Sequence, residues 1–283
     1  MNDAVLARCR AGEISPQIAL AQMVIGGMLP SPDLLADLAG QEAPGSPVIQ
    51  LAALAEAQRD RLSALERVAA SGIDPIGDDP VTATAALFDR LAATAPEAAV
   101  AFYSLGDPAL LDGATAELVG VIRDWVRVDG RDVLDLGCGI GRVALALADE
   151  ALSVLGVDVS AGMVEEARRR GAGLAGVRFE QGNGRDLAGL DDASIDLMLA
   201  VDSFPYLVRA GEDLVRSHLA EAARVLRPGG ALLVFNWSYR GDLALDMADA
   251  CHLGPLHGFT VQRVGERPFR IWDGSGFHLV RAA

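Results

Sequence analysis

One stretch decides the fold of this chain: Val133-Leu134-Asp135-Leu136-Gly137-Cys138-Gly139-Ile140-Gly141-Arg142. An apolar strand ends in an acid, enters a glycine turn and continues into an apolar helix. Glycines at alternate positions let the backbone turn sharply and lie against a ligand, because no Cβ stands in the way. The helix start offers unpaired N–H groups and the positive end of a dipole. The stretch therefore predicts a strand–turn–helix unit that binds a nucleotide-like ligand.

The spacing of the glycines indicates which kind of nucleotide. Dinucleotide-binding turns follow G-x-G-x-x-G/A, whereas Gly137, Gly139 and Gly141 form G-x-G-x-G. Arg142 stands where the dinucleotide pattern has Gly or Ala, and Asp135 would repel a pyrophosphate. A ligand that carries an amine would be attracted to Asp135. The turn therefore favours an amine-bearing nucleoside over a dinucleotide.

An apolar strand followed by D-x-G-x-G-x-G resembles motif I of the class I S-adenosylmethionine (SAM)-dependent methyltransferases. The resemblance covers residues 114–283 and implies SAM as the cofactor and S-adenosylhomocysteine (SAH) as its product. It implies that Asp135 holds the methionine end of SAM. The turn residues that it implies for cofactor binding are Gly137, Cys138, Gly139 and Gly141.

Composition and charge exclude several classes of function. The chain has 283 residues, of which 51% are hydrophobic, enough for a sizeable core and an appended segment. Its formal net charge is −15, and it contains no Lys. Without Lys there is no Schiff base and no Walker-type phosphate loop. The acidic balance argues against nucleic acid and against an anionic membrane, because both require a basic face.

Cysteine and histidine usage argues against disulfides and metal sites. The three cysteines, Cys9, Cys138 and Cys251, are widely separated. None of the four histidines has metal-ligand spacing to a Cys or Glu. The first residues lack a signal-peptide pattern, and the apolar runs are shorter than a membrane span. We therefore expect a reduced, cytoplasmic protein without a metal and without a membrane anchor.

Residues 1–95 are predicted to be an all-helical N-terminal segment. Ser-Pro pairs at 15–16, 31–32 and 46–47 predict helix starts, because Ser caps a helix and Pro suits its first turn. The longest predicted helix runs from about 47 to 70. Its apolar seam has heptad-like spacing that Gln58 interrupts: Val48, Leu51, Ala55, Leu62, Leu65 and Ala69. The seam fits a small helical bundle, or alternatively a homodimer contact or a lid over the substrate.

Residues 96–283 are predicted to form a Rossmann-like methyltransferase domain. Apolar runs alternate with helical patterns, which is typical of a doubly wound α/β sheet. The last two runs lack a crossover helix between them, so we expect a mostly parallel sheet with an antiparallel final strand. Seven strands are predicted: 131–136, 152–158, 177–181, 194–201, 230–236, 258–264 and 275–281. Helices are predicted between them at 140–150, 161–170, 211–226 and 241–250.

The ends of the second and third strands are candidate cofactor sites. Asp158 ends the second strand, and an acid there can accept both ribose hydroxyls; its alternative role is to cap the next helix. The resemblance implies that Val159 and Met163 contact adenine, although Met163 equally suits core packing. After the third strand, Asn183 and Gly184 stand where the family has Gly-Asp. Asn183 is expected to accept from the adenine amino group, or alternatively to form an Asn-Gly turn, with Asp186 as another acceptor.

The segment after the fourth strand corresponds to motif IV of the family. Val201, Asp202 and Ser203 are expected to border the cofactor, and Asp202 is also a candidate weak general base. Phe204 and Tyr206 are expected to wall the acceptor. Residues 226–230 predict a helix stop and a turn into the fifth strand.

Other candidate residues lie outside the motifs. Trp237 and Tyr239, with Asn236, follow the fifth strand and are candidates for the acceptor site. His252 and His257 are candidate proton acceptors, with ordinary structural roles as the alternative. Tyr103 stands where the family often has a helix that covers the cofactor, and helix packing is its alternative role.

Together these features predict a methyltransferase that acts by in-line displacement on a small molecule at N, O or S. Two alternatives remain from the sequence. One is a non-catalytic SAM-binding regulatory or assembly protein. The other is a nicotinamide-dependent reductase, which the glycine spacing and the absence of a Tyr-x-x-x-Lys pair oppose.

Overall fold

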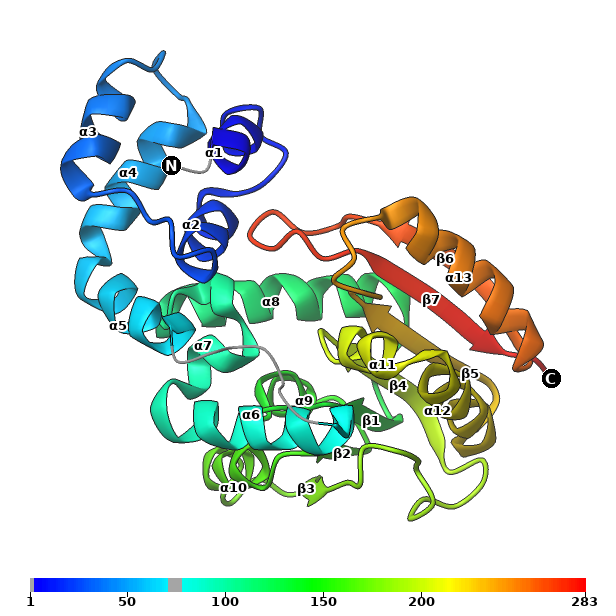
Figure 1. The fold of residues 1–283 in the computed structure, drawn as a ribbon. Helices are drawn as coiled ribbons and strands as arrows, with labels where there is room; N and C mark the ends of the chain where they lie inside the picture. The colour runs from blue at the N-terminus through cyan, green and yellow to red at the C-terminus, as the bar shows by residue number, and fades with distance from the viewer. Residues whose placement is uncertain (1–2, 71–77) are drawn as a thin grey trace. The chain divides into compact units, whose positions relative to one another are not determined.

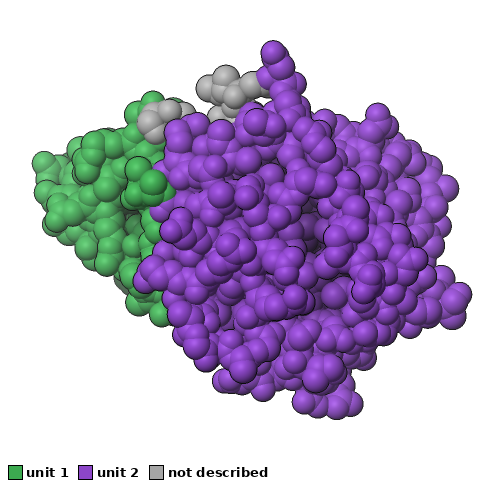
Figure 2. Space-filling view, turned by 90° about the horizontal axis from the view of Figure 1, so that it is seen from below, with its two compact units in different colours: residues 1–74, 93–114, 269–273 green, residues 75–92, 115–268, 274–283 purple. Residues whose placement is uncertain are grey.

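The computed structural model describes residues 3–70 and 78–283, which fall into two compact units coloured separately in Figure 2. Among the described residues, the first unit comprises 3–70, 93–114 and 269–273. The second comprises 78–92, 115–268 and 274–283. The chain therefore passes between the units several times. A single boundary between residues 95 and 96 stays a prediction.

The first unit is helical. Ser15, Ser31 and Ser46 each accept a backbone N–H as N-caps, and a proline follows each of them, as the Ser-Pro pairs predict. The elements of the unit are α1 (Asp3–Arg10), α2 (Pro16–Ile25), α3 (Pro32–Gly40), α4 (Pro47–Ala57), α5 (Arg59–Ala70), α7 (Pro96–Val100), the 3-10 turn η1 (Phe102–Ser104) and the start of α8 (Pro108–Trp125).

The single helix predicted over 47–70 is wrong, because the structure breaks it at Gln58. Gln58 leaves helical geometry with φ −111° and ψ 18°, and its amide donates to the Asp107 carboxylate. The apolar seam still faces inward on both helices, with Leu51 and Leu62 at most 2% exposed. The seam thus packs inside the first unit, as the bundle interpretation predicts. A homodimer through these helices stays a prediction.

The second unit contains the predicted α/β sheet. In the described part of the chain, seven strands pair in the order β3-β2-β1-β4-β5-β7-β6, and β7 runs antiparallel to both of its neighbours. The strands are β1 (Asp132–Leu136), β2 (Ser153–Asp158), β3 (Val177–Gln181), β4 (Ile195–Val201), β5 (Leu226–Phe235), β6 (Phe259–Glu266) and β7 (Gly276–Arg281). This topology confirms the predicted fold class.

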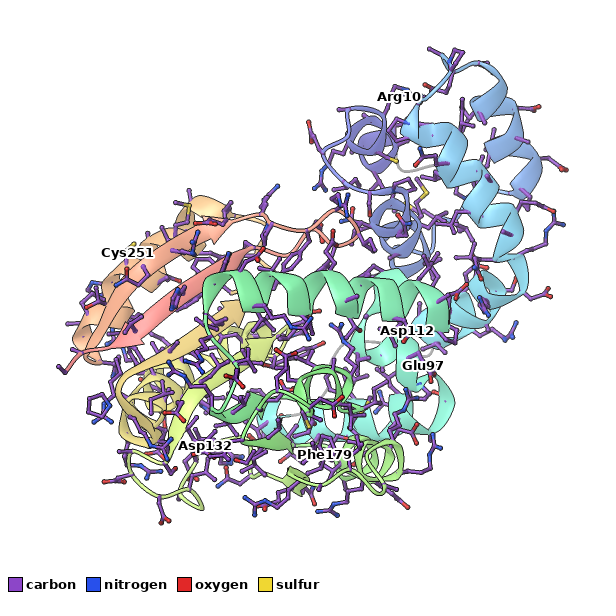
Figure 3. The ribbon with its side chains drawn as sticks, turned by 180° about the vertical axis from the view of Figure 1, so that it is seen from behind. Arg10, Glu97, Asp112, Asp132, Phe179 and Cys251 are labelled. Carbon is purple, nitrogen blue, oxygen red and sulfur yellow. The ribbon has the colours of Figure 1, made fainter. Side chains whose placement is uncertain are left out.

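Helices cover both faces of this sheet (Figures 1 and 3). The Trp125 end of α8 packs beside Gly276, and α13 packs against the opposite side of β7 at Leu279. Buried apolar side chains of β1, β4 and β5 fill the space between the helices and the sheet. The other helices of the unit are α6 (Pro80–Thr94, up to residue 92), α9 (Arg142–Leu147), α10 (Ala161–Arg170), α11 (Phe204–Ala210), α12 (Glu212–Val225) and α13 (Leu243–Leu256).

Two elements near the end of β4 and the start of β5 differ from the prediction. Residues 204–210 form α11, with Pro205 in its first turn, where no helix is predicted. Strand β5 begins at Leu226, four residues earlier than predicted. Its pairing with β4 shifts between Ile195 and Leu197, so residues 227–230 form a bulge instead of a separate turn.

Membrane-spanning helices and metal-binding clusters are both absent from the described residues. Within residues 3–70 and 78–283, no helix is both long enough and apolar enough to cross a membrane. Over the same ranges, no group of three or more His, Cys, Asp or Glu side chains is arranged to hold a metal ion.

Candidate functional site

The turn between β1 and α9 uses its own backbone N–H groups. Gly137, Gly139 and Gly141 have φ of +72°, +53° and +79°, a region that only glycine adopts without strain. The N–H groups of Gly137 and Cys138 donate to the carbonyl of Val157 at 2.7 and 3.1 Å, and that of Gly141 donates to Cys138 at 2.9 Å. The Gly139 N–H donates to Asp158 Oδ2 at 2.8 Å. The turn is therefore not a cradle of free N–H groups of the kind that binds phosphate.

The turn also lies in close contact with two neighbouring elements. A Cβ at Gly137 would overlap the side chain of Ser203, whose hydroxyl donates to the Leu136 carbonyl at 2.7 Å. A Cβ at Gly141 would stand 2.7 Å from the ring of Phe179, a residue of β3 labelled in Figure 3. Close packing therefore requires glycine at positions 137 and 141, in addition to the requirement set by the backbone conformation.

Asp135 is a buried carboxylate with an unsatisfied oxygen. Its side chain is 1% exposed and accepts from the Ala144 backbone N–H, while Oδ2 has no hydrogen-bond partner among the described residues. Burial raises the pKa of Asp135 to about 7, although the charge of Arg142 acts in the opposite direction. A buried polar atom without a partner is costly, so Oδ2 suits a ligand that brings a positive charge or a hydrogen-bond donor.

Asp158 fastens the glycine turn to the end of β2. Its Oδ2 accepts from Gly139, and its Oδ1 accepts from the Ser160 N–H at 2.9 Å. The Val159 N–H also donates to this carboxylate, which leaves one of its roughly four acceptor positions for a ligand hydroxyl. Burial raises the pKa of Asp158. The N-cap of α10 is Ser160, whose hydroxyl accepts from Met163, so Asp158 is not needed as the cap. Its contact with ribose stays a prediction.

Helix α6 is fastened to the loops that follow β2 and β3. Asp89 Oδ1 accepts from the Ser160 hydroxyl at 2.6 Å and from the Gly162 N–H at 2.9 Å. Val81 lies so close to Gly184 that a Cβ there would approach it to 2.7 Å. Asp79 pairs with Arg185 at 2.5 Å. The sequence does not indicate these partners, because a helical pattern does not say which loops the helix will contact.

Two of the candidate cofactor residues have structural roles here. The Asn183 carbonyl oxygen accepts from the N–H groups of Arg185, at 2.7 Å, and Asp186, at 3.0 Å. Both acceptor positions are therefore occupied, and the expected contact with the adenine amino group gives way to the turn. Met163, on the buried face of α10, is 0% exposed, so core packing is the better assignment. Val159 is partly exposed and remains a candidate.

A polar group stands where β4 and β5 end side by side. Val201 pairs with Phe235, so the next residues, Asp202 and Asn236, are neighbours at this edge. Both adopt a left-handed conformation, with φ of +56° and +73°. Asp202 Oδ1 accepts from Asn236 Nδ2 at 2.8 Å and from the Tyr239 hydroxyl at 3.0 Å. Strained backbone of this kind clusters at functional sites, which makes this edge a candidate acceptor site.

Phe204 and Trp237, two of the expected acceptor residues, belong to the core instead. Phe204 is 2% exposed and Trp237 is 0% exposed, and their ring centroids are 4.5 Å apart. Trp237 also packs on Phe277 of β7 at 5.3 Å. Both side chains therefore pack in the interior of the second unit.

The two candidate histidines are not brought to the carboxyl ends of the strands. Helix α13 starts after β5 and runs back along the sheet. His257 therefore precedes β6 at the other end, where Phe259 pairs with Arg281. His252 is an exposed residue of the same helix. Burial lowers the pKa of His257. We therefore assign neither histidine to the chemistry.

The remaining expected residues lie as follows. Tyr103 belongs to the first unit, where it is 5% exposed and stacks on Trp272 at 5.8 Å, so its proposed role as a lid stays a prediction. Val201 is buried at the end of β4. The residues that the structure does bring to the carboxyl edge of the sheet are Asp135, Gly137, Cys138, Gly139, Gly141, Asp158, Val159, Gly184, Asp202, Ser203, Tyr206 and Tyr239.

Comparisons with known proteins show which family the chain resembles. A family model described as a methyltransferase domain matches residues 133–230. Over 153 residues the chain is 32% identical to the demethylmenaquinone methyltransferase of Clavibacter sepedonicus, covering 54% of this chain and 57% of that protein. Over 108 residues it is 37% identical to a probable SAM-dependent methyltransferase of Mycolicibacterium smegmatis, covering 38% of each. The chain thus spans less than two thirds of these relatives.

A solved structure shares the fold. The phosphoethanolamine N-methyltransferase 1 of Haemonchus contortus, in complex with phosphoethanolamine and SAH, aligns with a TM-score of 0.53 and 17% identity. The alignment covers 72% of this chain and 49% of that one. At this identity the likeness concerns the fold alone.

Proposed function

The chain carries a class I, Rossmann-like SAM-dependent methyltransferase domain, and we propose that it is an enzyme that transfers the SAM methyl group to a small-molecule acceptor. The observation that carries the proposal is the electrostatic character of the glycine turn. The N–H groups of Gly137, Cys138, Gly139 and Gly141 are used within the protein, and the buried carboxylates of Asp135 and Asp158 flank the turn. Such a site repels a pyrophosphate and suits a cationic nucleoside, which also opposes a nicotinamide-dependent reductase.

The residues present fit SAM. The unpartnered Asp135 Oδ2 would accept from the methionine ammonium group, and Asp158 would accept from the ribose hydroxyls. Val159 and the backbone at Gly184 would border the adenine ring, beside α6. The burial of both carboxylates supports these assignments, since a buried charge is stable only with a partner.

The chemistry that remains for the chain is mostly positioning. When bound, SAM supplies a methyl group on a sulfonium, which is a good leaving group. The chain has to hold the acceptor in line with that methyl group and exclude water, and good alignment is worth about 7–11 kcal/mol. Asp202 would accept the proton that the acceptor releases. Its carboxylate lies at the end of β4, next to Ser203, which contacts Gly137 of the glycine turn.

The charge of the chain supports a small acceptor. A formal net charge of −15 without any Lys disfavours DNA and RNA as substrates. The proposal therefore places a small molecule, bound at the carboxyl edge of the sheet, ahead of a macromolecular acceptor.

Methyl-labelled SAM tests this proposal. The purified protein is incubated with labelled SAM and fractions of a cell extract that contain small molecules, proteins or nucleic acids. We expect label to appear in the small-molecule fraction, and to appear there more slowly with Asp135→Asn protein at a limiting concentration of SAM. Label in a macromolecular fraction would contradict the small acceptor. SAH binding without transfer to any fraction would point to a non-catalytic SAM-binding protein.

A further inference from the structure

The loop between β5 and α13 carries a set of hydrogen bonds around one buried carboxylate. Asp246, in the first turn of α13, is 4% exposed and accepts from the Ser238 hydroxyl at 2.6 Å. The Arg240 guanidinium donates to the same oxygen of Asp246 at 2.6 Å. Arg240 also donates to the Ser238 hydroxyl, from its backbone N–H at 3.2 Å and from Nε at 3.0 Å. We call these three residues the Asp246 network.

The Asp246 network fixes the residue that lies between two of its members. Tyr239 stands between Ser238 and Arg240 in the chain, and both of these neighbours are fastened to α13. Before them, Trp237 is 0% exposed in the core. The backbone at Tyr239 is therefore held on both sides, although the Tyr239 side chain itself is 55% exposed.

The Tyr239 hydroxyl is directed at the end of β4. It donates to Asp202 Oδ1 at 3.0 Å, and Asn236 Nδ2 donates to the same oxygen at 2.8 Å. Desolvation of the hydroxyl, together with the neighbouring Asp202 and Tyr206, raises the pKa of Tyr239 well above its usual value. Tyr239 therefore remains a donor near neutral pH. A side chain that is half exposed keeps such a bond only while its backbone holds it in place, because water competes for both partners.

The two donors to Asp202 are supported in different ways. Asn236 directly follows β5, and its own N–H donates to the Ser275 carbonyl at 2.6 Å. Tyr239 lies further along the loop, beyond the end of the pairing between β5 and β7. Strand pairing therefore supports Asn236, whereas the Asp246 network supports Tyr239.

We propose that Asp246 is a positioning residue: by fastening Ser238 and Arg240 to α13, it presents the Tyr239 hydroxyl to the Asp202 carboxylate. The inference rests on the proposed function, in which Asp202 accepts a proton, and adds the residues that orient this carboxylate. Asp246 is assigned no contact with cofactor or acceptor, and its charge is paired with the Arg240 guanidinium. Its effect on methyl transfer passes through Tyr239.

The ionisation of Tyr239 tests this link without a substrate. Ultraviolet difference spectra count ionised tyrosines around the ordinary tyrosine pKa of about 10. They are recorded for wild-type and Asp246→Ala proteins, each with and without Tyr239→Phe, so that subtraction isolates Tyr239. We expect Tyr239 to stay protonated through this range in the wild-type background and to ionise near pH 10 in Asp246→Ala. Identical titration of Tyr239 in the two backgrounds would overturn the inference.

Two further variants separate positioning from charge. Asp249→Ala is the matched control, because it removes one negative charge and one Arg240 partner from the same helix. Tyr239 should titrate in this variant as in the wild-type protein, and a change as large as that in Asp246→Ala would contradict the assignment. Ser238→Ala keeps every charge and removes the bridging hydroxyl, so it should release Tyr239 as Asp246→Ala does. Unchanged titration in Ser238→Ala would also contradict it.

Methyl transfer gives an independent readout, with the small-molecule fraction of a cell extract as the acceptor. Asp246→Ala should lower the rate at saturating SAM by up to about 100-fold, the cost of misplacing a group by about 1 Å, and leave the KM for SAM unchanged. In a Tyr239→Phe background the same change should lower the rate little further, because both substitutions remove one contact. Additive effects, or a matching rise in the KM for SAM, would overturn the assignment to Tyr239.

The possible failures are distinguishable. Circular dichroism at each pH shows whether a variant is folded, and Ser238→Ala carries the test if Asp246→Ala does not fold. If the wild-type protein transfers methyl groups but Tyr239 titrates alike with and without Asp246, the inference alone fails. If Asp246→Ala releases Tyr239 but the wild-type protein transfers no methyl group, the proposed function fails and the role of Asp246 in catalysis fails with it.

Discussion

Asp135 is a buried carboxylate in the proposed cofactor site. Its pKa of about 7 means that near neutral pH the carboxyl is partly protonated. A cation at Oδ2 would favour the ionised form, because an opposite charge close by lowers the pKa of a carboxyl group. Binding of the cofactor should therefore release a proton.

SAH affinity should rise with pH through about 7, because the carboxylate has to be ionised to hold the ammonium group. Asp135→Asn keeps an acceptor for the Ala144 N–H but cannot ionise. We expect it to weaken binding by about 1.5–3 kcal/mol and to abolish this pH dependence. Calorimetric titrations below and above the pKa check both effects. An affinity of the wild-type protein that ignores pH in this range would count against the role of Asp135.

The same residue should make the ligand-free protein less stable as pH rises. The folded pKa of about 7 lies above the ordinary value of 3.8, so the folded state binds the proton more tightly than the unfolded chain. The contribution is fully present below about pH 4 and is lost as pH rises through about 7, with a size on the order of 4 kcal/mol. Burial also raises the pKa of Asp158, so its contribution has the same sign.

Comparing wild-type and Asp135→Asn proteins isolates this contribution from those of other acids. We expect the wild-type free energy of unfolding to fall more steeply with pH than that of the variant. Urea denaturation at several pH values measures the difference. Parallel curves for the two proteins would show that Asp135 does not titrate in this range.

At the residue scale, the strand and glycine-turn pattern predicts the positions of residues that are fixed by their own local structure. Asp135 and Asp158 end strands, so their place at the carboxyl edge follows from the strand pattern alone. The expected ligand contacts of Asn183 and Trp237 stay predictions, because the surroundings of both side chains depend on contacts that a sequence pattern does not contain. The Asn183 oxygen is occupied by its own turn, and Trp237 faces Phe204 and Phe277 in the core.

At the element scale, α6 is the helix that the sequence places least well. It looks like a member of the N-terminal helical segment, yet Asp89 bonds to the start of α10. Through Ser160 this contact reaches Asp158, whose Oδ1 accepts the Ser160 N–H. The helix therefore supports the cofactor loops through a short chain of hydrogen bonds.

Removing the Asp89 carboxylate should loosen this attachment. We expect Asp89→Ala to increase amide hydrogen exchange in α6 and to weaken SAH binding by about 1 kcal/mol, because bonds to a charged acceptor are lost at a partly exposed site. Asp191→Ala is the matched control. Exchange in α6 that is unchanged by Asp89→Ala would mean that other contacts hold the helix.

Helix boundaries were predictable where capping residues mark them and not elsewhere. Ser-Pro pairs set the starts of α2, α3 and α4. No Gly or Pro marks the break at Gln58. The break accompanies a hydrogen bond from the Gln58 amide to Asp107, which is distant in the sequence. The early start of β5 depends on a bulge against β4, which is a property of the pairing.

At the scale of the whole molecule, the alternation of strands and helices was sufficient to predict the seven-stranded sheet with its antiparallel end. The interleaving of the two units was not predictable, because residues 93–114 and 269–273 join the first unit only through tertiary contacts. Dimerisation, cytoplasmic location and the absence of a metal remain predictions.

The net charge of −15 should distinguish SAM from SAH. SAM carries one more positive charge than SAH, so the field of the acidic protein attracts it more strongly. We expect the association rate of SAM to fall several-fold from low to physiological ionic strength, and that of SAH to change less. Stopped-flow binding measures both rates. An equal response of the two ligands would exclude long-range attraction.

The central claim is that the bend from Asp135 to Gly141, closed by Asp158, holds a sulfonium nucleoside. The most direct test is an SAH titration of the wild-type protein and of Asp158→Ala. We expect saturable binding by the wild-type protein, competition by SAM and not by NADH, and a loss of about 1.5–3 kcal/mol in the variant. Absence of SAH binding, or competition by NADH, would contradict it.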